Sequence, residues 1–86
     1  MTYRLSNHAR EEMDRRGIPA DLLDSVMERP GQVVPAYGGK SAYQSQMRFD
    51  DGKMYLLRAI VDETGSPVKV VTVYRTSRTG KYWRKE

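Results

Sequence analysis

Residues 68–75, Val-Lys-Val-Val-Thr-Val-Tyr-Arg, form the segment that decides the fold of this chain. Val70, Val71 and Val73 lie on both faces of an extended segment, which predicts a strand that other elements cover on each side. A strand covered in this way lies inside a sheet. The neighbouring strands and the covering layer must therefore come from the segments that precede it.

Three preceding segments are expected to supply those strands. Residues 53–62 end at a loop over 63–67, and residues 42–49 lead into the tight-turn sequence Asp-Asp-Gly-Lys at 50–53. A shorter strand is predicted at 32–36. Hairpins join antiparallel strands, so one antiparallel sheet of three to four strands is expected.

Alternation within residues 42–49 indicates how that strand faces its surroundings. Tyr43 and Met47 alternate with Gln44 and Gln46. This period of two predicts one face against the core and one polar face in water.

The covering layer is expected from two helices near the amino terminus. Ser6 or Asn7 can cap a helix that runs to about Arg16, and Gly17 suits the left-handed residue that ends it. Apolar residues at helical spacing predict a second helix over about 19–28. The sequence thus predicts a single α+β domain over residues 1–86, with two N-terminal helices packed on the sheet.

Length and composition limit the classes of function. The chain has 86 residues, of which 38% are hydrophobic and 30% charged, so one small folded domain is expected. It has no cysteine and one histidine, which excludes disulfides, thiolate nucleophiles and multi-histidine metal sites. No apolar stretch approaches the roughly 20 residues of a membrane span, so a cytoplasmic protein without membrane contact is expected.

The net charge of +4 comes from the end of the chain. Residues 75–86 contain five basic side chains and one acidic one, whereas residues 17–74 contain six basic and seven acidic ones. The basic residues alternate with hydroxyls and with Tyr82 and Trp83, a combination that suits the phosphates and bases of single-stranded nucleic acid. The alternative is a solvated terminus in which Trp83 folds back onto the core.

His8 is the only histidine, and histidine is the residue type whose ordinary pKa lies near neutrality, so it is a candidate for proton transfer. It shares one arc of the first helix with Glu12 and Arg15. Glu12 can hold the imidazole in one tautomer, as carboxylates do in acid–base sites. The alternative is a histidine that caps the helix or packs at the core margin, without catalysis.

Tyr74-Arg75-Thr76-Ser77 forms a second candidate group, at the end of the central strand. Arg75 offers a planar set of donors matched to phosphate, and the hydroxyls of Thr76 and Ser77 add further donors. Such a group can stabilise charge that develops on a phosphate. The alternative is that Tyr74 packs in the core while Arg75 and Ser77 close a loop.

If His8 and Arg75 face one another, the chemistry open to them without a metal ion or cofactor is transesterification of RNA. The ribose 2′-hydroxyl attacks the adjacent phosphate, which needs a proton acceptor, a proton donor and positive charge on the phosphate oxygens. Asp50-Asp51 and Asp62-Glu63 are more typical of turns than of metal sites.

Two motifs lie near the ends of the chain. The first is Leu5-Ser6-Asn7-His8-Ala9-Arg10-Glu11-Glu12-Met13 with Arg16-Gly17-Ile18, and the second is Val71-Thr72-Val73-Tyr74-Arg75-Thr76-Ser77 with Lys81-Tyr82-Trp83. Together they resemble a bacterial family of domains of unknown function that is placed near ribonuclease toxins of the RelE, barnase and colicin type. The resemblance implies a RelE/barnase-like fold, an RNA-cleaving or RNA-binding role and a small antitoxin protein as partner.

The family motifs fall on His8, Tyr74, Arg75, Thr76, Ser77, Lys81, Tyr82 and Trp83, and the charge and helix patterns described above add Arg15, Arg78, Arg84 and Glu12. Together they give the expected catalytic set His8, Arg75, Ser77 and Tyr82; the expected RNA-binding set Arg15, Arg78, Lys81, Trp83 and Arg84; and the supporting residues Glu12, Tyr74 and Thr76. The family usually has arginine just before the helix methionine, and here Glu12 occupies that position. This removes a positive charge, which Arg15 or Arg16 can replace.

The leading hypothesis is a metal-independent endoribonuclease toxin of a toxin–antitoxin pair, with His8 as general acid or base and with Arg75 and Lys81 as phosphate clamps. One alternative is a noncatalytic RNA-binding module that uses the basic tail. The other is an interaction protein whose exposed sheet edge pairs with a strand of its partner.

Overall fold

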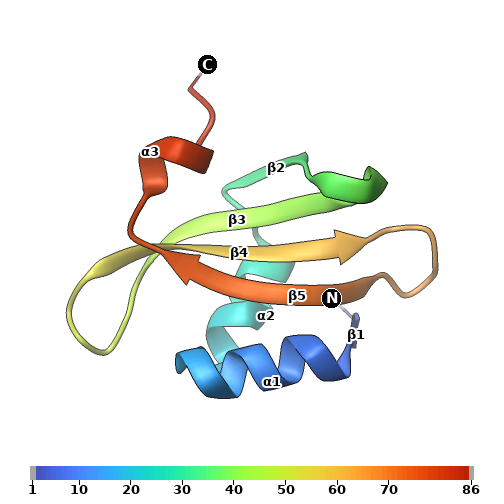
Figure 1. Ribbon diagram of the computed structural model, residues 1–86, viewed down its shortest axis with the longest axis horizontal. Helices are drawn as coiled ribbons and strands as arrows, with labels where there is room; N and C mark the ends of the chain where they lie inside the picture. Colours follow the sequence, from blue (N-terminus) through green and yellow to red (C-terminus); the bar gives the residue numbers. More distant parts are fainter. Residues whose placement is uncertain (1, 86) are drawn as a thin grey trace.

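A five-stranded sheet forms in residues 2–85, the part of the chain that this computed structural model describes. Its middle strand is formed by residues 54–62, whereas the strand predicted to be central, over 68–75, lies second from the edge and is flanked on its outer side by a strand of two residues. The strands of the sheet are β1 (Arg4–Leu5), β2 (Gln32–Pro35), β3 (Ser41–Arg48), β4 (Met54–Asp62) and β5 (Lys69–Thr76). They lie in the order β1-β5-β4-β3-β2, with β1 parallel to β5 and every other pair antiparallel (Figure 1).

Three helices accompany the sheet, and together they confirm the predicted α+β class. They are α1 (Asn7–Arg16), α2 (Ala20–Glu28) and the short α3 (Thr79–Tyr82), and a 3-10 turn, η1 (Tyr37–Gly39), precedes β3. None of the helices in the described residues is long and apolar enough to cross a lipid bilayer.

The predicted ends of α1 are confirmed by its capping contacts. The Ser6 hydroxyl oxygen accepts a hydrogen bond from the Ala9 N–H at 2.9 Å, and Gly17 takes a left-handed conformation with φ 63°. The helix therefore begins and ends where the local side-chain chemistry requires it to.

The strand count and the sheet type differ from the prediction of three to four antiparallel strands. The additional strand is β1, which makes the sheet mixed because it runs parallel to β5. It is held by hydrogen bonds from the Arg4 N–H to the Val68 carbonyl at 2.8 Å and from the Ser6 N–H to the Val70 carbonyl at 3.0 Å. Two residues are too short for an alternating pattern, so only the pairing itself identifies this strand.

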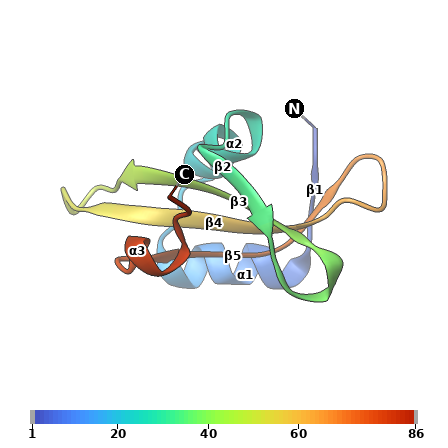
Figure 2. The same cartoon turned by 90° about the horizontal axis from the view of Figure 1, so that it is seen from above.

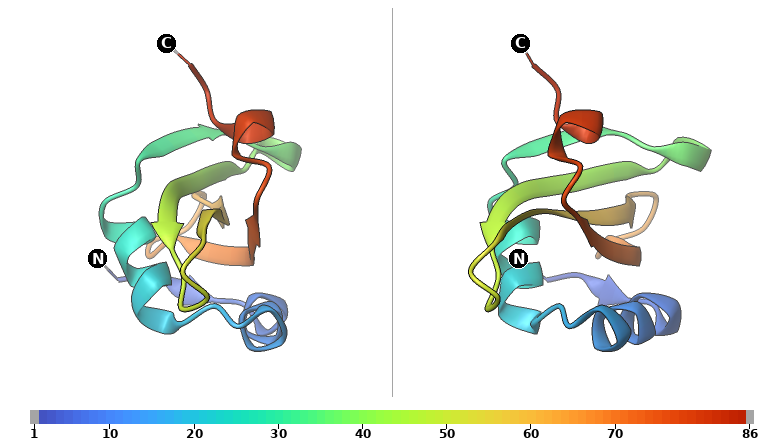
Figure 3. Two further views of the ribbon diagram at one scale, coloured as in Figure 1. Left: turned by 90° about the vertical axis from the view of Figure 1, so that its left-hand side faces the viewer. Right: turned by 60° about the vertical axis from the view of Figure 1, so that its left-hand side comes forward.

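The helices α1 and α2 cover one face of the sheet, as predicted, and α3 lies over the other (Figure 3). We call the first the helix face, which carries Leu57, Ala59 and Val73, and the second the tail face, which carries Arg58 and Tyr74. Seen from above, the end of the chain crosses the tail face beside β2 (Figure 2).

The prediction that Gln44 lies on a wet face is wrong. Its side chain is completely buried on the tail face, because α3 and the residues after it cover that part of the sheet. The next residue on the same face, Gln46, is exposed as predicted. The helix α3 and the residues after it therefore bury one part of a strand face that is otherwise polar and exposed.

Candidate functional site

A row of polar side chains crosses the tail face at one level of the sheet. The strand register pairs Gln32 with Gln44, Gln44 with Arg58, and Arg58 with Tyr74. Residues paired directly across strands point to the same face. Four consecutive strands, β2 to β5, thus contribute one polar side chain each to a single line.

Hydrogen bonds connect this row from end to end. Gln44 Nε2 donates to Gln32 Oε1 at 2.9 Å, Arg58 Nε donates to Gln44 Oε1 at 2.8 Å, and Arg58 Nη1 donates to the Tyr74 hydroxyl. Arg58 is only 8% exposed. A buried guanidinium is tolerated only when it has partners, and this network supplies them.

Tyr82, from α3, completes the cluster from above the sheet. The Arg58 guanidinium carbon lies 4.2 Å from the centre of the Tyr82 ring and 5.6 Å from that of Tyr74. The two rings meet edge to face with centroids 6.2 Å apart. We call Gln44, Arg58, Tyr74 and Tyr82 the tyrosine–arginine cluster.

The tail is held over the sheet by backbone contacts of α3 and the residues that follow it. Gln44 Nε2 donates to the Tyr82 carbonyl at 3.1 Å, and Gln32 exchanges two hydrogen bonds with the Arg84 backbone. The Trp83 ring packs on Gly31, where a Cβ atom would lie 2.9 Å from it. Trp83, predicted to bind RNA, thus folds back onto the protein.

The two tyrosines of the cluster have pKa values shifted in opposite directions. Burial raises the pKa of Tyr74, against the opposing effect of Arg58. Burial also acts to raise the pKa of Tyr82, but the neighbouring Lys81, the Tyr74 hydroxyl and the charge of Arg58 outweigh it and lower that pKa. Paired groups with divergent pKa values are the arrangement that acid–base chemistry uses.

Basic side chains surround the cluster. Arg78, Lys81 and Arg84 are exposed on and around α3, and Lys81 Nζ lies 5.2 Å from the centre of the Tyr82 ring. A hollow of about 340 Å³ lies beside them, between β2 and residues 84–85. These predicted RNA-binding residues therefore sit on the tail face with Tyr82.

Arg75 lies on the opposite face, because it pairs with Leu57 rather than with Arg58. Its guanidinium carbon is 4.6 Å from the ring centres of both Phe49 and Tyr55. There it lines a hollow of about 670 Å³, which we call the arginine pocket, formed by Arg15, Arg16, Gly17, Tyr55, Arg75, Thr76 and Ser77. Four predicted site residues, Arg15, Arg75, Thr76 and Ser77, thus meet at this place.

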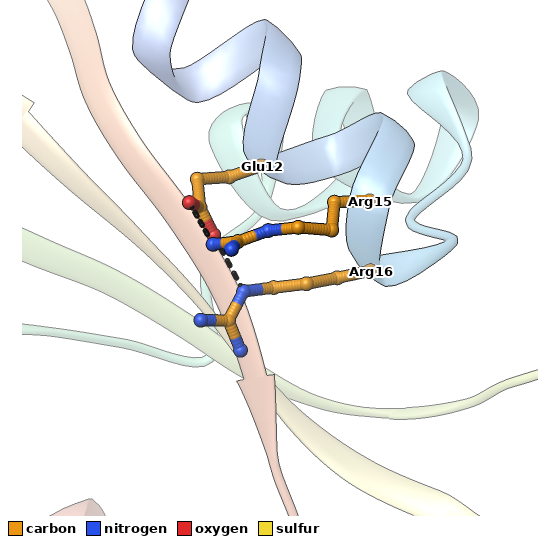
Figure 4. Close-up of polar contacts among 3 residues, drawn as sticks. All are labelled: Glu12, Arg15 and Arg16. Carbon is orange, nitrogen blue, oxygen red and sulfur yellow. Dashed lines mark hydrogen bonds and ion pairs between the residues drawn. The ribbon is translucent and has the colours of Figure 1, made fainter.

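Glu12 binds Arg15 and Arg16, and not His8, which it was predicted to orient. Its carboxylate accepts hydrogen bonds from Arg15 Nη2 and, at 2.6 Å, from Arg16 Nε (Figure 4). These hydrogen bonds lower the pKa of Glu12 from 4.5 to about 2. The carboxylate is therefore ionised at neutral pH and bound to two cations.

The structure does not bring His8 and Arg75 together. The helix α1 lies along β5 with its start beside Val70, whereas its last residues line the pocket with Arg75 (Figure 1). His8 is exposed in the first turn, about 10 Å along the helix axis from Arg15. It is not among the described residues that line the arginine pocket.

Arg58 and Gln44 are the site residues that the sequence analysis missed. The available signal was positional: Arg58 interrupts the apolar segment of β4, and Gln44 lies directly across from it once the hairpin register is known. A charged side chain at an inward position is rare without a function or a partner. Within residues 2–85, no three His, Asp or Glu side chains gather where they could hold a metal ion.

Comparison with known proteins gives one match. The family model described as a domain of unknown function, DUF4258, matches residues 5–75, and the chain belongs to this family. The match includes Arg58, Tyr74 and Arg75 but ends before Tyr82. Neither the curated proteins nor the solved structures give a match.

Proposed function

We propose that this member of the DUF4258 family is a metal-independent endoribonuclease whose reaction centre is the tyrosine–arginine cluster. The observation that carries the proposal is the meeting of one buried guanidinium with two tyrosines whose pKa values diverge. Transesterification of RNA needs a proton acceptor, a proton donor and a fixed positive charge, and the cluster contains all three.

Three residues of the tyrosine–arginine cluster each have one role in the reaction. Tyr82, whose pKa is lowered, takes the proton from the ribose 2′-hydroxyl as that oxygen forms its bond to phosphorus. Arg58 stabilises the charge on the non-bridging oxygens. Tyr74, whose pKa is raised, gives its proton to the 5′ oxygen as the phosphorus–oxygen bond breaks. The products are a 2′,3′-cyclic phosphate and a 5′-hydroxyl.

The surroundings of the cluster support an RNA substrate. Arg78, Lys81 and Arg84 provide positive charge along the path that an RNA backbone would follow across the tail face. This assignment moves proton transfer from His8, which lies on α1 across the sheet, to the two tyrosines. The RelE/barnase-like relationship and the antitoxin partner are part of this proposal, and they rest on the sequence resemblance.

The test measures cleavage of a 5′-labelled RNA in EDTA, with a parallel assay that supplies mRNA bound to ribosomes. The wild-type protein is expected to release fragments ending in 2′,3′-cyclic phosphate. Tyr82→Phe removes only a hydroxyl and should slow cleavage about 100-fold. Tyr37→Phe is the matched control, because Tyr37 is 64% exposed and lies outside the cluster.

Two results would contradict the proposal. One is RNA binding without product in both assays, which would leave a noncatalytic RNA-binding protein. The other is wild-type cleavage by Tyr82→Phe, which would show that this hydroxyl takes no part in proton transfer.

A further inference from the structure

We infer that the arginine pocket on the helix face is a second binding site, specific for a phosphate monoester, the dianionic group found at the end of a nucleic acid or on a small metabolite. It lies across the sheet from the tyrosine–arginine cluster and shares no residue with it. The inference therefore goes beyond the proposed ribonuclease activity and does not depend on it.

The first observation is an incomplete hydrogen-bond set on Arg75. Its Nη1 is buried and has no hydrogen-bond partner within residues 2–85. Buried N–H groups almost always have a partner, and leaving one without costs free energy. The guanidinium carbon lies 4.6 Å from the ring centres of Phe49 and Tyr55, which are 5.2 Å apart and meet edge to face, so Arg75 packs beside this aromatic pair and neither ring supplies a hydrogen-bond acceptor for Nη1. Arg75 lines the pocket, so a rotation of its guanidinium toward the hollow would bring this nitrogen to an acceptor oxygen of a ligand.

The second observation is the way Glu12 arranges two further arginines. It binds one nitrogen of Arg15 and one of Arg16, and each guanidinium carries five N–H donors. Figure 4 shows the terminal nitrogens of Arg16 pointing away from Glu12, toward the end of β5. Glu12 thus holds both side chains in place and leaves most of their donors for a ligand.

The charges and hydrogen-bond donors of the arginine pocket indicate which class of ligand it binds. Three arginines line the pocket and no acidic residue does, while the carboxylate of Glu12, paired with Arg15 and Arg16, offsets one of the positive charges. The next carboxylate, Asp51, accepts the Tyr55 hydroxyl at 2.6 Å and is not among the lining residues, but its charge also acts on Arg75. A phosphate monoester carries a charge of about −1.5 to −2 at pH 7 and offers three acceptor oxygens, so it can accept hydrogen bonds from more of the arginine donors than a diester, which has two unesterified oxygens. Ser77, at the end of β5, also lines the pocket.

The test compares two DNA oligomers that differ only in their 5′ end, phosphate or hydroxyl, by isothermal titration calorimetry at low salt. DNA lacks the 2′-hydroxyl, so cleavage cannot occur and failure of the proposed ribonuclease would not affect the result. The phosphorylated oligomer is expected to bind about tenfold more tightly, the effect of one strong charge-assisted hydrogen bond. Inorganic phosphate, titrated alone, distinguishes a small-molecule source from a nucleic-acid end.

Three variants complete the design. Arg75→Gln and Arg16→Gln should each abolish the preference for the phosphorylated end, and Arg16→Gln changes a side chain that is 43% exposed, so it should fold normally. Arg10→Gln, an exposed arginine of the same helix outside the pocket, should retain the preference. Equal binding of the two oligomers with no heat from inorganic phosphate would overturn the inference. So would a preference that survives in both pocket variants.

Discussion

Each face of the sheet has one arginine that lies against two aromatic rings, but the two arginines differ in their hydrogen bonding. On the tail face, Arg58 is covered by α3 and bonded to Gln44 and Tyr74. On the helix face, Arg75 also lies against two rings, but its buried Nη1 has no partner within residues 2–85 and the residue lines an open hollow.

The difference shows what each arginine can do. A guanidinium that has no buried nitrogen left without a partner, as Arg58 has none within residues 2–85, acts through its charge, polarising the tyrosines around it. A guanidinium with unused donors acts by binding, because a ligand can supply what the protein does not. Arg58 is therefore suited to a reaction centre and Arg75 to a receptor for an anion.

The stability of two matched variants tests this comparison most directly. Arg58→Met leaves the Gln44 oxygen and the Tyr74 hydroxyl without their donor, so it should lower the free energy of unfolding by about 3 kcal/mol. Arg75→Met keeps apolar contact with the rings and removes an unpartnered nitrogen, so it should cost less than about 1 kcal/mol. Urea denaturation measures both, and equal losses would contradict the distinction.

The pH dependence of RNA cleavage sharpens the assignment on the tail face. Tyr82 must be deprotonated and Tyr74 protonated, so the rate should rise with pH and then fall. Because the pKa of Tyr82 is lowered, the rising limb should lie below the ordinary tyrosine value of about 10. Because the pKa of Tyr74 is raised, the falling limb should lie above it. Tyr82→Phe should remove the rising limb, and a rising limb that persists would argue for another base.

Docking of the tail is tested by Gly31→Ala, whose Cβ atom would meet the Trp83 ring at 2.9 Å and the Gln44 carbonyl at 3.3 Å. We expect a loss of about 1–3 kcal/mol and a shift of tryptophan fluorescence to longer wavelength, since Trp83 is the only tryptophan. Gly80→Ala is the control, because nothing lies within 4 Å of its added Cβ. An unchanged emission spectrum in Gly31→Ala would show that the position of the Trp83 ring does not depend on its contact with Gly31.

The smallest effect is expected on the helix face, at acid pH. The pKa of Glu12 is lowered to about 2, so its contribution to stability is present above about pH 4.5 and is lost as the pH falls through 2. Glu12→Gln should therefore reduce the decline of the melting temperature between pH 5 and pH 2. Glu11→Gln, which alters an exposed neighbour on α1, should leave that decline unchanged. A decline of equal size in both variants would show that the Glu12 ion pairs add nothing.

Prediction from sequence succeeded where local chemistry decides the outcome. The start of α1, the left-handed Gly17 and the turn before β4 were placed correctly, because each depends on residues that are neighbours in the chain, and the structure selects Ser6 from the two predicted caps. It failed at β1, whose two residues are defined by pairing with β5, and at Gln44, whose burial depends on a helix almost forty residues later.

For the candidate site, the sequence identified Tyr74, Arg75, Tyr82 and the basic tail as residues of interest. It grouped Tyr74 with Arg75 because they are adjacent, but adjacent strand residues point to opposite faces, and the strand register assigns them to different sites. It also placed His8 with Arg75, although α1 holds His8 at the end remote from the pocket.

The sequence by itself determined the α+β class, the positions of α1, α2 and the four longer strands, and the concentration of positive charge at the end of the chain. These follow from periodicity, capping and turn chemistry, which act over a few residues. Only the tertiary structure decided that Gln44, Arg58, Tyr74 and Tyr82 form one cluster and that Arg15, Arg16 and Arg75 form another. The physical reason is that strand register and helix packing determine which side chains meet, and both depend on contacts between segments far apart in the chain.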